Sequence, residues 1–136
     1  MTSKVALVHC STYYDEGAVA AAVARGIELI GGMPAFVKPS ESIVLKPNVL
    51  VGRAPEKQIG PHPFVFKAVA RQVQAVTSKI TYGDSPSAGK PIAHMRRAGY
   101  DDVARQLGIE LGDFDGGREV HFPDSPFLKH FTLANA

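Results

Sequence analysis

The sequence predicts an α/β fold, a three-layer sandwich in which a mainly parallel sheet of about four strands carries helices on both faces. Two observations lead to this prediction. Short apolar segments rich in β-branched residues alternate with longer segments in which apolar residues recur every three or four positions. Their order along the chain, strand–helix three times and then a strand, is typical of a parallel sheet with right-handed crossovers. The 136 residues suit a single domain over the whole chain, 1–136.

The first half of the chain predicts two strands and the helix between them. Lys4–Cys10 is continuous in Val, Ala and Leu, which predicts a first buried strand. A helix follows from about Asp15 to Ile30, where four apolar residues are spaced by four, four and three positions. The central strand is Ile43–Leu45, and Pro47 ends regular pairing soon after it because proline cannot donate to a neighbouring strand.

The next segments continue the alternation. Pro63 can occupy the first turn of a second helix, which ends near residues 77–78. Lys79–Tyr82 is the predicted third strand. Two helical pieces follow, over about 91–98 and from Asp101 to Leu107, and Asp101 is the residue type that caps a helix.

The last third of the chain predicts short strands. Ile109–Phe114 would be the fourth strand of the sheet, and Gly108 separates it from the helix before it. Glu119–Phe122 and Leu128–Leu133 flank a break that contains two prolines, so they can form an antiparallel edge.

Polar side chains follow each of the first three predicted strands. Because the carboxyl ends of parallel strands meet at one edge, these side chains are expected to lie together where α/β proteins bind ligands. The set comprises Ser11, Thr12, Lys46, Asn48, Asp84, Ser85 and Ser87. One cation, one amide, one carboxylate and several hydroxyls suit a small anionic or phosphorylated ligand.

Lys46 and Asp84 are the candidate catalytic residues of this edge. Lys46 would bind the anion or polarise a carbonyl, while Asn48 would orient the ligand. Asp84 would act as a base or hold a divalent metal. Simpler interpretations stand beside these: Lys46 extends into water, Asn48 serves a turn, and Asp84 with Ser85 caps the turn that follows.

A long loop from Gly52 to Pro63 starts where the central strand ends. Its glycines and prolines leave no room for a helix, and loops of this length in compact domains are functional or mobile. His62 lies between two prolines of this loop. It could swing over the polar edge as a general acid or base, or it could belong to a rigid exposed turn.

Composition excludes several classes of function. The net charge is only +2, and no run of like charge is longer than Arg96–Arg97, so no nucleic-acid partner is expected. No apolar stretch approaches membrane-spanning length and no signal-peptide pattern is present, which favours the cytoplasm. Cys10 is the single cysteine, so this chain alone cannot build an iron–sulfur cluster.

Two common binding motifs are also absent from the sequence. The five histidines form no H-x-H or H-x-x-x-H pair, so no metal site is predicted from them. The segment Gly83–Lys90 has five residues between its glycines where a P-loop has four, and Pro91 follows where the P-loop has Ser or Thr.

The chain resembles the family called domain of unknown function 362. The resemblance lies in Val44–Asn48, Pro61–Pro63, Gly83–Pro86, Gly99–Tyr100 and Gly108–Leu111. It implies an α/β protein of unsettled activity, in a family where many members carry cysteine-rich, ferredoxin-like segments elsewhere. It also implies that this chain is an amino-terminal portion or a shortened member. The site positions that the resemblance carries over are Lys46, Asn48, Asp84 and Ser85.

Three hypotheses of function follow. The first is an enzyme domain that acts on a small anionic substrate at the polar edge. The second is a non-catalytic module of a redox, iron–sulfur protein, in which the same edge binds a ligand or docks a partner. The third is a structural piece of a longer enzyme, for which an apolar patch at Phe127–Leu133 that pairs with a second copy would be evidence.

Overall fold

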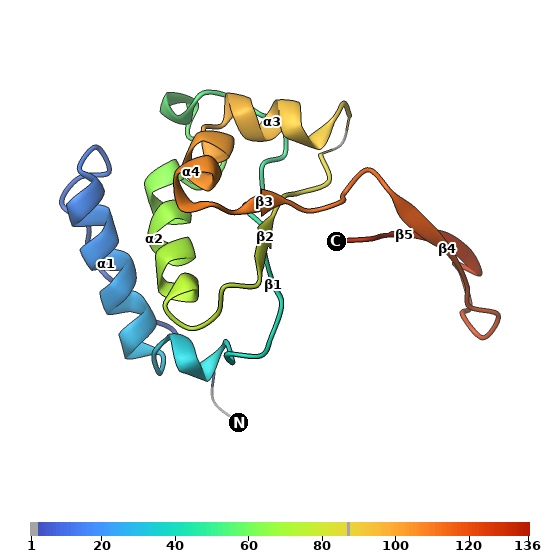
Figure 1. The fold of residues 1–136 in the computed structure, drawn as a ribbon, viewed down its shortest axis with the longest axis horizontal. Helices are drawn as coiled ribbons and strands as arrows, with labels where there is room; N and C mark the ends of the chain where they lie inside the picture. Colours follow the sequence, from blue (N-terminus) through green and yellow to red (C-terminus); the bar gives the residue numbers. More distant parts are fainter. Residues whose placement is uncertain (1–2, 87) are drawn as a thin grey trace.

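The structure is a computed structural model that describes residues 3–86 and 88–136, so Ser87 lies outside the described residues. It contains four α-helices, two 3₁₀ turns (Met33–Ala35 and Pro55–Lys57) and five strands (Figure 1). The helices are α1 (Glu16–Leu29), α2 (Pro63–Gln74), α3 (Pro91–Arg97) and α4 (Tyr100–Leu107). The strands are β1 (Ile43–Leu45), β2 (Ile80–Tyr82), β3 (Glu110–Leu111), β4 (Gly117–His121) and β5 (His130–Ala134).

Three of the strands form a parallel sheet in the order β1-β2-β3. Leu45 pairs with Tyr82, and Tyr82 with Leu111, so all three strands end at the same edge. This confirms the α/β class and the mainly parallel sheet. The sheet has three strands where about four were predicted, because the segment expected to provide the first strand does not join it.

Residues 4–10 form neither a strand nor a helix, so the prediction of a first strand at Lys4–Cys10 is wrong. Val5 is 90% exposed and Leu7 is 96% exposed. Apolar composition indicates a tendency to be buried, but a strand also needs a partner for its backbone groups. This segment instead passes along α1, where a Cβ added to Gly26 would lie 3.8 Å from Cγ2 of Val8.

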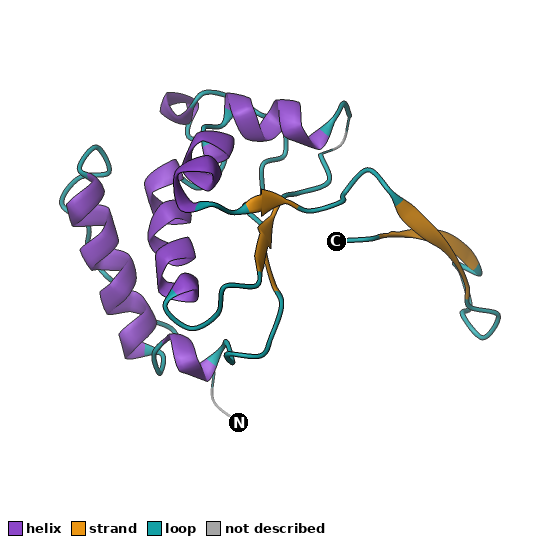
Figure 2. Cartoon of the chain, viewed as in Figure 1, coloured by secondary structure: helices purple, strands orange, loops and turns teal. Residues whose placement is uncertain are grey.

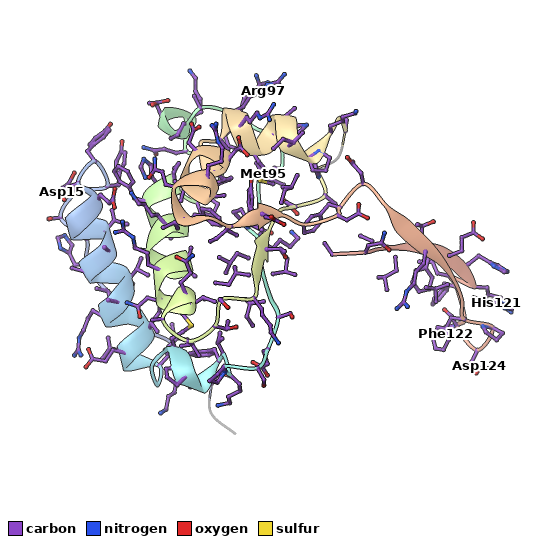
Figure 3. All side chains as sticks on the ribbon, viewed as in Figure 1. Asp15, Met95, Arg97, His121, Phe122 and Asp124 are labelled. Carbon is purple, nitrogen blue, oxygen red and sulfur yellow. The ribbon has the colours of Figure 1, made fainter. Side chains whose placement is uncertain are left out.

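The strands β4 and β5 pair antiparallel as a separate two-stranded sheet. They were expected as an edge of the main sheet, but they form an arm that projects away from it (Figure 2). His121, Phe122 and Asp124 lie toward the outer end of this arm (Figure 3). Phe127 at its turn is 91% exposed.

The core lies between one face of the parallel sheet and the helices α2, α3 and α4. Alternation along the strands directs Leu45, Ile80 and Tyr82 toward α2, and all three are buried in the same cluster as Phe66. Val44 has the opposite orientation and is 44% exposed. The sequence predicted a second layer of helices on that face, but this layer does not cover β1.

The helices begin as the sequence predicts, with one exception. Oδ1 of Asp15 accepts from the N–H groups of Gly17 and Ala18 and so caps α1. Pro63 occupies the first turn of α2, where its missing N–H costs nothing. Asp101 was expected to cap the fourth helix, but Gly99, with φ of +79°, holds the cap position and Asp101 lies buried in the first turn.

Among the described residues, no helix is both long and apolar enough to span a bilayer.

Candidate functional site

Lys46 and Asp84 follow the carboxyl ends of β1 and β2 and form an ion pair. Nζ of Lys46 lies 2.6 Å from Oδ1 of Asp84 and donates to Oδ1 of Asn48 over 2.7 Å. The parallel register brings these residues to one edge because Leu45 and Tyr82, the last residues of the two strands, lie side by side. The structure thus brings together three residues that the sequence predicted to share a site.

Asp84 is buried and fully engaged, with only 5% of its surface exposed. Its Oδ2 accepts from the N–H of Val49 over 2.8 Å, and its Oδ1 accepts from the N–H of Ser85 over 2.9 Å. Burial alone would raise the pKa of Asp84, but the Lys46 ammonium and the two backbone donors outweigh it and hold that pKa below its ordinary value. Asp84 is therefore a stable carboxylate at neutral pH.

The lowered pKa bears on the chemistry that Asp84 can perform. A general base that works near neutral pH is effective when its pKa lies close to that pH, which for a carboxyl group requires a raised value. Asp84 is shifted in the other direction. Its geometry favours holding Lys46 in place and joining the loop after β1 to the loop after β2.

A cleft of about 800 Å³ opens beside the ion pair. Its walls come from the segments after β1 and β2 and from part of the long loop before α2. The lining residues are Lys46, Asn48, Leu50, Val51, Gln58, Ile59, Gly60, Pro61, Asp84 and Ser85. The long loop that the sequence singled out therefore provides one wall of the cleft.

Two tyrosines fix that wall. The hydroxyl of Tyr100 donates to the carbonyl oxygen of Pro61 over 2.6 Å, and Nε2 of Gln58 donates to the hydroxyl of Tyr13 over 2.9 Å. Burial, together with the negative charge of Asp84, raises the pKa of Tyr100 to about 12. Tyr100 is therefore a neutral hydrogen-bond donor across the physiological range.

The remaining predicted ligand residues are divided between the cleft and other places. Ser85 lines the cleft, whereas Ser11, Thr12 and His62 are not among its lining residues. Oγ1 of Thr12 accepts from the N–H of Tyr14, within its own turn. Ser11 and Thr12 were placed at the edge because Lys4–Cys10 was expected to be a strand, and that strand does not form.

His62 caps α2. Its Nδ1 accepts from the N–H of Phe64 over 3.3 Å, and its ring packs against the rings of Tyr13 and Phe64. A small hollow of about 140 Å³ lies there, lined by these three rings with Tyr14 and Glu56. His62 thus lies in an aromatic cluster beside the start of α2.

His94 is a structurally important residue that the sequence did not reveal. It is buried on α3, and its Nδ1 accepts from the N–H of Gly52 over 2.8 Å. A Cβ at Gly52 would lie 2.5 Å from Cα and from the carbonyl oxygen of His94. Only a glycine allows this approach, so Gly52 was the one available signal that the loop packs against another backbone.

The oxygen atoms that could face a metal ion are occupied by the lysine. Oδ1 of Asp84 and Oδ1 of Asn48 both bind the Lys46 ammonium, which stands where a cation shared by these two oxygens would sit. Within residues 3–86 and 88–136 there is no group of three or more His, Cys, Asp or Glu side chains suited to a metal.

Two comparisons with known proteins each found a match. The family model described as Domain of unknown function (DUF362) matches residues 43–136, a range that contains Lys46, Asn48, Asp84 and Ser85. The chain is also similar to the thylakoid-associated protein sll1697 of Synechocystis sp. (strain ATCC 27184 / PCC 6803 / Kazusa), with 35% identity over 134 residues. The match covers 98% of this chain and 41% of that relative, so the chain spans about two fifths of its length. No solved structure matches.

Proposed function

Because this chain belongs to the DUF362 family, whose description assigns no activity, we propose a function from the geometry of its cleft. The cleft binds a small anionic or phosphorylated ligand, as part of an enzyme. The observation that carries this proposal is the Lys46 ammonium, which is held by two oxygens and lines an open cleft of about 800 Å³. Clefts at the carboxyl edge of parallel strands are the usual ligand sites of α/β folds.

Lys46 supplies the charge. A lysine ammonium has three donors. Two of them are directed to Asp84 and Asn48, and the third has no acceptor among residues 3–86 and 88–136, so it can bind a carboxylate, phosphate or carbonyl oxygen of a ligand. Asp84 acts as a positioning residue, because its bonds to Val49 and Ser85 fix the place where the ammonium is held. In catalysis Lys46 would stabilise negative charge that develops on a substrate oxygen.

The test is ligand-dependent thermal stability. Inorganic phosphate, pyrophosphate and oxalate are titrated against the chain, since a ligand that binds only the folded state raises the unfolding temperature as its concentration rises. Lys46→Met should abolish the increase. Lys129→Met, which removes an exposed lysine on the arm, should keep it. Equal increases in the Lys46→Met variant and the natural chain would refute this role for Lys46.

A second candidate is a structural role, in which the chain pairs with a second copy of itself through its carboxyl-terminal segment. It is favoured by the β4–β5 arm, where Phe122, Phe127, Leu128 and Leu133 are 53%, 91%, 66% and 46% exposed. The partner we propose is a second copy of the chain. Sedimentation velocity should then show a dimer that Phe127→Ser weakens, and a monomer at every concentration would remove this candidate.

The location proposed for this chain is the cytoplasm. The relative's printed name, thylakoid-associated, supports the alternative of contact with a membrane surface. Fractionation of cells that express the tagged chain would separate the two. Recovery in the membrane pellet, with release by salt, would overturn the cytoplasmic proposal in favour of a surface contact.

A further inference from the structure

Lys46 lines two hollows of different character. The first is the polar cleft, where its ammonium meets Asp84 and Asn48. The second is an apolar groove of about 160 Å³ between α2 and the end of β1. Besides Lys46, the groove is lined by Leu45, Pro47, Pro61, Val65, Phe66 and Val69. Lys46 and Pro61 belong to both hollows, so cleft and groove adjoin at these two residues.

The ammonium of Lys46 belongs to the cleft. Both oxygens that bind the ammonium belong to residues of the cleft, and neither Asp84 nor Asn48 lines the groove. The charged group of Lys46 therefore lies on the cleft side, and the groove adjoins the cleft at residues Lys46 and Pro61.

The apolar wall follows from the sequence of α2. Val65 and Val69 are four residues apart, so they stand one above the other on the same face of the helix. Both remain partly exposed, while Phe66 beside them is buried in the core. On the opposite side, Leu45 ends β1, an edge strand of the parallel sheet, and Pro47 lies two residues after it.

We propose that the ligand of this site is an amphipathic carboxylate, with an anionic head on Lys46 and a short apolar chain in the groove. This inference rests on the proposed function, since the same ammonium binds the head. A charged cleft and an apolar groove that share two lining residues fit a molecule that has both characters, whereas a small inorganic anion would leave the groove unused. A volume of about 160 Å³ suits a chain of a few carbons.

The experiment is a titration of the full chain, followed by amide chemical shifts, with acetate and hexanoate as probes. Each methylene fully removed from water strengthens binding about fourfold. The groove is open on one side, so we expect hexanoate to bind about tenfold or more tightly than acetate. The shifts with hexanoate should extend from Lys46 to Val65 and Val69, while those with acetate should stay near Lys46.

Variants separate the head from the chain. Lys46→Met should abolish binding of both acids. Val69→Phe, which fills the groove, should bring the two affinities within about twofold of each other, and its amide spectrum shows whether it is folded. Lys129→Met should behave as the natural chain. Hexan-1-ol, which has the chain without the charge, should bind at least tenfold more weakly than hexanoate.

Each failure has its own meaning. If acetate binds and hexanoate binds no more tightly, the amphipathic ligand is wrong and the anion site stands. If neither acid nor phosphate binds, the proposed function is wrong. This inference is then wrong as well, because it rests on the same anion site. If the amides of residues 4–10 are protected from exchange in the absence of ligand, this segment pairs with the edge of β1 and covers the groove, which also overturns the inference.

Discussion

The backbone N–H of Val49 donates to Oδ2 of Asp84 over 2.8 Å, across 35 residues of sequence. The other carboxylate oxygen receives the Lys46 ammonium and the N–H of Ser85. One buried side chain thus joins the segments that follow two neighbouring strands. The shape of the cleft depends on Asp84 even though no ligand needs to contact it.

Asp84→Asn should lower the free energy of unfolding by about 2 kcal/mol. The substitution removes the charge that three donors share, and hydrogen bonds to a charged group are worth about 1.5–3 kcal/mol. Lys46 is half-exposed, so the ion pair itself contributes only part of this loss. Urea denaturation measures the change, and Asp124→Asn on the exposed turn of the arm is the matched control, expected within about 0.5 kcal/mol of the natural chain. Equal stability of the two variants would contradict the anchoring role.

Acid should destabilise the natural chain more than the Asp84→Asn variant. The pKa of Asp84 is lower in the folded state than its ordinary value of 3.8, so the unfolded chain binds a proton more readily. The stabilisation from this group is complete above the ordinary pKa and is lost as the pH falls through the lower, folded value. Denaturation at steps between about pH 6 and pH 3 should therefore show curves that converge in acid. Parallel curves would show that Asp84 has no perturbed pKa.

Tyr100→Phe should weaken the wall of the cleft. It deprives the carbonyl oxygen of Pro61 of its donor, at a cost of about 1 kcal/mol. Because burial raises the pKa of Tyr100 to about 12, its share of the stability is complete below pH 10 and is lost as the pH rises from 10 through 12. Absorbance at about 295 nm should show that the natural chain has one more late-titrating tyrosine than the variant. Titration of all the tyrosines near pH 10 would contradict the burial of Tyr100.

Two glycine substitutions should act in opposite directions. Gly52→Ala places a methyl group 2.5 Å from the backbone of His94, a contact that the helix cannot relieve without moving, and should destabilise by about 1–3 kcal/mol. Gly26→Ala lies in the interior of α1, where the new methyl group meets Val8 at an ordinary 3.8 Å, and should stabilise by about 0.5–1 kcal/mol. Thermal denaturation of the two variants, measured side by side, compares their unfolding temperatures. A Gly52→Ala variant as stable as Gly26→Ala would show that the loop does not pack on α3.

The sequence predicts those parts of the site that depend on strand direction. Lys46, Asn48 and Asp84 could be grouped because two apolar segments with a helix between them pair parallel, and both are followed by polar residues. The structure of Lys4–Cys10 could not be predicted in the same way. Its apolar residues predict burial, but the choice between a strand and a chain passing along a helix depends on which backbone partners are within reach.

Contacts between residues far apart in the chain could not be predicted from the sequence, for a different reason. Gly52 meets His94 across 42 residues, and Tyr100 meets Pro61 across 39. Neither pair has a periodic pattern or a motif, because a single bond between a loop and a helix requires only that one donor and one acceptor lie close together. The two strands of the arm form close to the segments that the sequence predicts. Their separation from the parallel sheet depends on the turn at residues 112–116, which has no apolar pattern.

The strands of the parallel sheet lie side by side in the order in which they occur along the chain. Each pairing therefore joins a strand to the next one made, and no early strand has to wait for a distant one. As the chain leaves the ribosome, β1 can pair with β2 once Tyr82 has emerged, before α3, α4 and β3 have left the exit tunnel. Assembly of the cleft can therefore begin during translation, when little more than the first half of the chain has left the ribosome.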